Sequence, residues 1–197
     1  MAKITSTKDI IMLLLYAKGY KGQKNEPIRT RIRMVKMVFL FQKEIRAKFN
    51  LEKAIPDSAF PDFQPYDYGP FADQIYADLE FLVNLGFVNP RPSCSDKEAE
   101  EDMCEYEYWQ VSSGIAGGSD NERNNAVEFS LTNNGLNFVK DGNLGNLTAE
   151  QWEGVHTFKC RCLEISLYAL LRYVYTKYPK MATNSKIAER IFKKRNV

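Results

Sequence analysis

The chain has 197 residues, of which 44% are hydrophobic and 26% are charged, and its formal net charge is +2. This length and composition allow one domain with a sizeable buried core. Because the net charge is nearly zero, it does not indicate a nucleic-acid or membrane partner. Only local clusters of charge can indicate one.

Cysteine and histidine are too few and too widely spaced to predict a metal site. Cys94, Cys104, Cys160 and Cys162 lack the C-x-x-C spacing of a zinc site, and His156 is the single histidine. We therefore expect reduced thiols, no metal and no other cofactor.

The amino-terminal part of the sequence predicts two helices. A first helix over residues 7–18 can be capped by Ser6 or Thr7, and its apolar run is too short and too close to Asp9 for a secretory signal. A long second helix over residues 29–49 carries its apolar residues on one side. Since the sequence has no apolar run of about 20 residues, which a bilayer span needs, we expect a cytoplasmic protein without a membrane partner.

An aromatic segment leads into the third predicted helix. Pro70 suits the first position of a helix over residues 70–85, and Gly86 suits the left-handed residue that ends one. Apolar residues recur along this helix at intervals of three and four, namely Phe71, Ile75, Leu79, Leu82 and Leu85. The pattern predicts a helix that packs one face on the core.

Two strand-like runs and three more helices follow. Residues 105–111 and 126–131 are rich in aromatic and β-branched side chains, which predicts an antiparallel hairpin. The three later helices have as their predicted N-caps Thr132, Thr148 and Ser185. The second of them, opened by a capping box with Gln151, is expected to continue to Tyr178, before Pro179.

This order of elements predicts an α+β fold. We expect a winged helix-turn-helix-like core with a β-hairpin wing over residues 1–145. Residues 146–197 are expected to form a C-terminal helical extension that packs on the same domain.

Several short motifs resemble the phage-associated SocA-like antitoxin group, also called Panacea, and its winged-helix relatives. They are Tyr66-Asp-Tyr-Gly-Pro-Phe71, the helix that runs to Gly86-Phe-Val88, Phe129-Ser-Leu-Thr-Asn-Asn-Gly135, and Glu26-Pro-Ile-Arg-Thr-Arg-Ile-Arg33, which is similar to the entry of the long second helix in those relatives. The resemblance covers approximately residues 5–140 and does not extend to residues 145–197. It implies an antitoxin-like or regulatory role and makes the motif residues candidates for binding a partner, namely Tyr66, Tyr68, Gly69, Pro70 and Phe71.

Local charge gives a second set of candidates. On the second predicted helix, four basic residues fall within a sector of about 80°, nearly opposite the apolar face; they are Arg29, Arg33, Lys36 and Lys43. The basic carboxyl-terminal segment adds Lys193, Lys194 and Arg195. Such a stripe either contacts nucleic-acid phosphates or is a solvated helix face, and the sequence leaves both interpretations open.

The third predicted helix argues against the usual mode of winged-helix DNA binding. Its polar residues are expected to be exposed, and none of them is basic. They are Asp73, Gln74, Asp78, Glu80 and Asn84. Contacts to bases or phosphates in the major groove favour Arg, Lys, Asn or Gln. Acidic side chains at this position would repel a phosphate backbone.

No catalytic set is recognisable in the sequence. A lone His156 without a predicted nucleophile and acid beside it favours a structural histidine. We therefore expect a non-catalytic regulatory protein that binds a protein partner, either a toxin or a regulatory protein. The alternative is a DNA-binding transcriptional regulator. The tyrosines from Tyr168 to Tyr178 either pack on the core or form the interface of a homodimer, and the sequence leaves both possibilities open.

Overall fold

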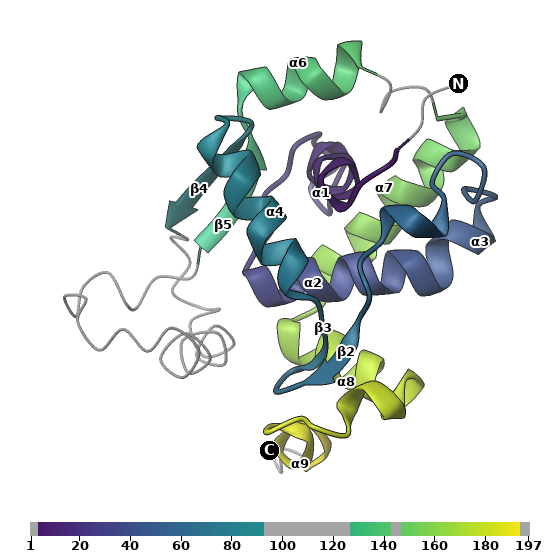
Figure 1. Ribbon diagram of the computed structural model, residues 1–197, viewed down its shortest axis with the longest axis vertical. Coiled ribbons are helices and arrows are strands. Elements are labelled where there is room, and N and C mark those ends of the chain that lie inside the picture. The colour runs from purple at the N-terminus through teal and green to yellow at the C-terminus, as the bar shows by residue number, and fades with distance from the viewer. Residues whose placement is uncertain (1–3, 93–126, 143–146, 194–197) are drawn as a thin grey trace.

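The computed structural model describes residues 4–92, 127–142 and 147–193. Within these ranges the chain is a mixed α+β structure with two small antiparallel sheets. Helix α2 (Arg31–Leu40) lies between α1 (Thr7–Tyr16) and α8 (Leu167–Lys177), as Figure 1 shows. Every residue from Ile32 to Leu40 is buried, so α2 is the central helix of the fold.

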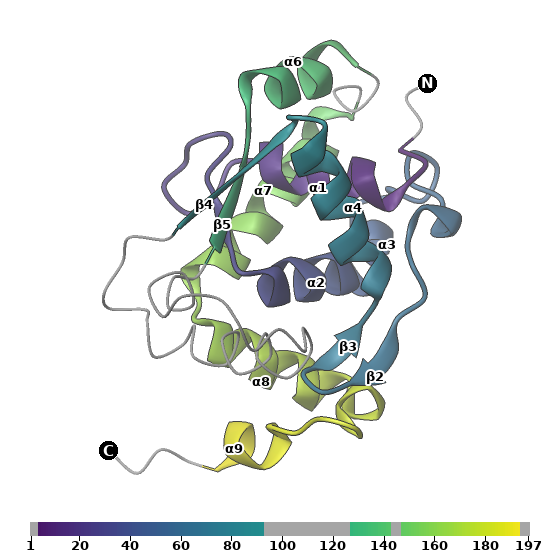
Figure 2. The same cartoon turned by 60° about the vertical axis from the view of Figure 1, so that its left-hand side comes forward.

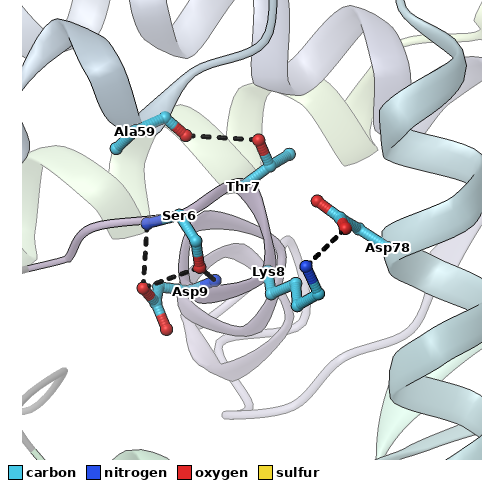
Figure 3. A network of polar contacts seen from close by, with 6 residues as sticks. All are labelled: Ser6, Thr7, Lys8, Asp9, Ala59 and Asp78. Carbon is cyan, nitrogen blue, oxygen red and sulfur yellow. Dashed lines mark hydrogen bonds and ion pairs between the residues drawn. The ribbon is translucent and has the colours of Figure 1, made fainter.

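Helix α1 begins where the sequence predicts. The Ser6 hydroxyl accepts from the Asp9 backbone N–H, and the Asp9 carboxylate accepts from the Ser6 backbone N–H at 3.0 Å (Figure 3). This reciprocal capping box satisfies two N–H groups that the first helical turn leaves without partners. All residues from Ile10 to Leu15 are buried, because neighbouring elements cover α1 on several sides.

The predicted second helix begins later than residue 29, because Arg29 lies in a strand, and it consists of three helical segments. Strand β1 (Ile28–Arg29) comes first, and α2 begins after Thr30, whose hydroxyl accepts from the Arg33 N–H at 3.1 Å. The helix continues through a π-helical turn, η1 (Phe41–Ile45), into α3 (Arg46–Lys48). A short 3₁₀ turn, η2 (Asp57–Ala59), follows in the connection to the next strand.

The expectation that Pro70 begins the third helix is wrong. Strands β2 (Gln64–Tyr66) and β3 (Gly69–Phe71) form a hairpin in which Tyr66 pairs with Gly69, so the turn contains only two residues. Helix α4 (Asp73–Asn84) begins beyond this hairpin. At its end Gly86 has a φ of +71°, the left-handed conformation expected there.

The larger sheet has the order β1, β5 (Val127–Leu131), β4 (Val88–Pro92). Strands β1 and β4 both pair with the central strand β5 and run antiparallel to it. The predicted partner strand, residues 105–111, lies outside the described residues. Helix α6 (Asn133–Asp141) follows β5, and the Thr132 hydroxyl caps it by accepting from the Gly135 N–H at 3.2 Å, as predicted.

The predicted long helix up to Tyr178 is interrupted. Helix α7 (Ala149–Glu164) has the expected Thr148 capping box, but it ends at Ile165, and Ser166 caps the new helix α8. The interruption is stabilised by the Arg33 guanidinium, which donates to the carbonyls of Cys162 and Ile165. The chain continues through a 3₁₀ turn, η4 (Pro179–Ala182), to α9 (Ala188–Phe192). The expectation that Ser185 caps this helix is wrong, because Ile187 holds the N-cap position without a side-chain cap and the Ser185 hydroxyl accepts from the Ile187 N–H, ahead of the helix.

Helices α7 and α8 share one hydrophobic core with the amino-terminal helices. The cluster of buried side chains includes Leu13 of α1, Phe39 of α2, Phe158 of α7 and Val174 of α8. Figure 2 shows α8 alongside the β2–β3 hairpin, on the opposite side of α2 from α1. Across the described residues, no helix is both long and apolar enough to cross a membrane.

Candidate functional site

The Tyr66–Phe71 segment presents aromatic rings on the outer face of the β2–β3 hairpin. The ring of Tyr66 stacks on that of Phe71 at 5.1 Å, and Phe71 meets Tyr76 edge-on at 5.3 Å. The guanidinium of Arg31 lies 5.5 Å from the centre of the Tyr76 ring. Tyr66 is 44% exposed, whereas Phe71, Tyr76 and Arg31 are half-buried. The cluster of these four residues, here called the aromatic surface, is therefore partly open to solvent.

The other three motif residues have a structural position. Tyr68, Gly69 and Pro70 belong to the hairpin itself and are buried. Gly69 has a φ of +84°, and a Cβ there would lie 2.5 Å from Cε1 of Tyr175 on α8. A partner therefore cannot contact these residues while the hairpin stays packed, and their role is to hold the aromatic surface in place.

Lys36 connects the two sets of candidates made from the sequence. Its Nζ donates to the Pro70 carbonyl at 2.8 Å, and burial lowers the pKa of Lys36 to about 7. A recess of about 10 Å³ lies beside it, enough for one water molecule. The recess is lined by Ile32, Val35, Lys36, Tyr66, Tyr68, Phe71 and Tyr76.

The expected basic stripe is not an exposed surface. Arg33 and Lys36 are buried, because the hairpin and the α7–α8 junction cover the sector that both interpretations of the stripe require to be exposed. Arg29 is half-buried in β1, where it pairs with Glu128 of β5. Lys43 alone of the four is exposed.

The basic carboxyl-terminal candidates are only partly described. Lys193 is exposed and lies 3.6 Å from the carboxylate of Glu189 on α9. Lys194 and Arg195 lie outside the described residues.

The exposed polar face of α4 is smaller than expected. Asp78 is buried and forms an ion pair of 2.7 Å with Lys8 of α1, so it joins two helices instead of facing solvent (Figure 3). The remaining four polar residues are exposed as expected, namely Asp73, Gln74, Glu80 and Asn84. The solvent face of α4 is therefore acidic and carries no basic side chain.

A basic loop between α1 and β1 contains lysines that were not among the individual candidate residues chosen from the sequence. Lys18, Lys21 and Lys24 are exposed there, and Tyr20 is 59% exposed. An isolated β-bridge joins Lys18 to Lys24 and closes the loop. The sequence signal for this loop is the repetition of lysine next to glycine. Periodicity gives no face for a loop, so the sequence did not indicate which of these lysines are exposed.

His156 and Cys162 occupy structural positions. The Nδ1 atom of His156 accepts from the Lys18 backbone N–H at 3.0 Å, and its ring stacks on Trp152 at 5.3 Å. Burial is the main cause that lowers the pKa of His156, which favours the neutral acceptor form seen here. Cys160 and Cys162 are free thiols, and burial raises the pKa of Cys162 to about 12, so the thiolate needed for nucleophilic chemistry is disfavoured there.

Comparisons with family models, curated proteins and solved structures found no match to this chain.

Proposed function

We propose that the protein is a non-catalytic, cytoplasmic regulatory protein of the antitoxin-like winged-helix class, and that it binds a protein partner through the aromatic surface. The observation that carries this proposal is the stack of the exposed Tyr66 on the half-buried Phe71, extended by Tyr76 and Arg31. The winged-helix and antitoxin-like parts of the proposal rest on the sequence resemblance. The partner would be a toxin or another regulatory protein.

The residue types and their rigidity support a role in protein binding. Tyrosine and arginine are enriched among the residues that contribute most to protein interfaces. Lys36 and Tyr175 hold the hairpin from below, so the rings are ordered before a partner arrives and little conformational entropy is lost on binding. The acidic side chains of Asp73 and Glu80 on α4 favour a partner whose contacting surface is basic.

Site-specific photo-crosslinking in the host cell tests this proposal. A crosslinking amino acid in place of Tyr66 should capture one defined protein, whereas the same replacement of Tyr20, which is more exposed and lies outside the aromatic surface, should not. Calorimetry with the purified partner should then show a loss of affinity of about tenfold or more for Tyr66→Ala, as for an interface hot spot. Equal affinity of the Tyr66→Ala and wild-type proteins would refute the proposal.

A second candidate function is binding of duplex DNA, and the exposed lysines of the loop between α1 and β1 favour it. Basic side chains release counterions from DNA, so binding weakens steeply as salt rises. Replacing Lys18, Lys21 and Lys24 by Ala should then reduce the slope of affinity against salt concentration by about three counterions at most. If the slope stays unchanged, or if no binding occurs at low salt, this second candidate is excluded.

A further inference from the structure

A groove with a volume of about 370 Å³ lies between the helix that contains α2, η1 and α3 on one side and helices α7 and α8 on the other. One wall is the continuous helix formed by the end of α2, η1 and α3, and the other walls are α7 and the start of α8. The volume falls within the range of about 300–1,000 Å³ that is typical of small-molecule sites. The groove shares no lining residue with the recess beside Lys36.

Part of the groove's lining, here called its floor, is apolar. It is formed by Leu40, Ile45, Phe49, Phe158, Ile165 and Leu170. Phe49 packs directly on Gly154 of α7, where a Cβ would lie 2.4 Å from Cγ of the phenylalanine ring. Both residues line the groove, and its volume suits a small molecule better than a partner helix.

One acidic group of the groove is already neutralised. The carboxylate of Glu44 forms an ion pair of 2.9 Å with Lys177 of α8. It also accepts hydrogen bonds from the hydroxyls of Tyr173, at 2.9 Å, and Tyr178, at 3.0 Å. Glu44 therefore contributes little net charge to a ligand in the groove.

The cations on the rim are not neutralised in this way. Lys48 of α3 and Arg161 of α7 line the groove and are exposed, and neither has a carboxylate partner among the described residues. Glu164 is the one acidic lining residue that Lys177 does not neutralise. The Nζ atom of Lys48 lies 5.5 Å from the centre of the Phe49 ring, a contact that leaves its positive charge in place. Two cations without a carboxylate partner against one carboxylate make the rim complementary to a singly charged anion.

We propose that this groove binds an amphipathic carboxylate of the size of a medium-chain fatty acid. Its hydrocarbon chain lies on the apolar floor, and its carboxylate is held by Lys48 and Arg161. Each cation contributes a charge-assisted hydrogen bond, and the floor removes apolar surface of the ligand from water. This site is independent of the aromatic surface and of the protein partner proposed above.

Calorimetry of the full chain with octanoate and with 1-octanol tests the proposal, because the two probes share a chain and differ in charge. Octanoate should bind saturably with one site per chain. Lys48→Gln and Arg161→Gln should each weaken octanoate binding by about tenfold while leaving 1-octanol binding unchanged. Glu164→Gln should strengthen octanoate binding, because it removes a like charge from the rim.

Two control variants distinguish binding in the groove from binding elsewhere on the surface and from self-association of the chain. Arg172→Gln removes an exposed cation of α8 that does not line the groove, and it should leave octanoate binding unchanged. Thr157→Trp fills the groove and should abolish binding of both probes while the circular dichroism spectrum stays that of the wild type. The proposal is overturned if Arg172→Gln weakens octanoate binding as much as Lys48→Gln does, or if octanoate shows no saturable binding. It is also overturned if the wild-type chain is a dimer that Thr157→Trp dissociates, because the groove would then be an interface between two copies of the chain.

Discussion

Among the described residues, three buried basic side chains donate to backbone carbonyls, two of them at the ends of helices and one in strand β3. Lys36 donates to Pro70 in the hairpin, and Arg33 donates to the carbonyls at the end of α7. Lys159 donates to Leu15 and to Ala17, at 2.8 and 2.9 Å, where α1 ends. Carbonyls at helix ends lack intrahelical partners, and a buried carbonyl without a hydrogen bond is costly. At the scale of single residues, the basic character of these three positions therefore reflects packing in the core.

The buried amine of Lys36 makes the stability of the protein depend on pH. The unfolded chain binds this proton below about pH 10.5, whereas the folded chain binds it only below about pH 7. Between these values the unfolded state carries more protons, so the free energy of unfolding rises with pH. Lys36→Met should reduce this slope by up to about 1.4 kcal/mol per pH unit, measured by urea denaturation at several pH values. Lys43→Met, at an exposed position of the same composite helix, should keep the wild-type slope, and an unchanged slope in Lys36→Met would contradict the assignment.

Arg33 provides a second test at the residue scale. Arg33→Met leaves the carbonyls of Cys162 and Ile165 buried without their donor, so the free energy of unfolding should fall by about 3 kcal/mol. Arg172→Met, on the exposed face of α8, should change it by less than about 0.5 kcal/mol. Chemical denaturation measures both, and similar values for the two variants would mean that Arg33 does not stabilise the junction.

At the scale of elements, three of the four predicted helix caps are confirmed and Ser185 is the exception. The expectations that contacts with distant partners override are wrong. The capping residues Ser6, Thr132 and Thr148 act through neighbours within three residues, so a short window of sequence reveals them. Pro70 has the local preferences of a helix start, but a strand partner and Lys36 hold it in β3. The break after Glu164 has a similar origin, since Arg33 lies more than 120 residues earlier in the chain.

The same contrast explains how much of the candidate site was predictable. Tyr66 and Phe71 could be selected from the sequence motif, and both belong to the aromatic surface. Tyr76 and Arg31 could not, because only the fold brings α4 and the start of α2 to the hairpin.

The contact between the hairpin and α8 gives a prediction at the element scale. Gly69→Ala places a methyl group against the ring of Tyr175, which is 1% exposed and hydrogen-bonded through its hydroxyl to Ser185 at 2.9 Å. Gly22→Ala is the matched control, because Gly22 also has a positive φ, +72°, but has no atom near the added group. Gly22→Ala should cost about 1–2 kcal/mol through the backbone alone. Gly69→Ala should cost about 2 kcal/mol more through overpacking, and thermal unfolding of both variants would reveal equal costs if the contact were unimportant.

At the scale of the whole molecule, the carboxyl-terminal helices form part of the core on which the aromatic surface depends. Helix α8 packs on the hairpin through Tyr175, and the end of α7 is held by Arg33 of α2. Lys159 of α7 in turn holds the end of α1. Because these links cross the boundary expected near residue 145, the two expected parts should depend on each other for stability.

Truncation tests this dependence. A chain of residues 1–146 loses a set of large buried core side chains, including Val155, Phe158, Leu170, Val174 and Tyr175. Burial of each stabilises the fold by about 1.5–3 kcal/mol, so their combined loss approaches or exceeds the 5–15 kcal/mol of net stability that is typical of a domain. The truncated chain should therefore show no cooperative thermal transition by circular dichroism. A chain of residues 1–192 keeps all five side chains and should unfold at the wild-type temperature, whereas a cooperative transition in the shorter chain would mean that residues 1–146 fold as an independent domain.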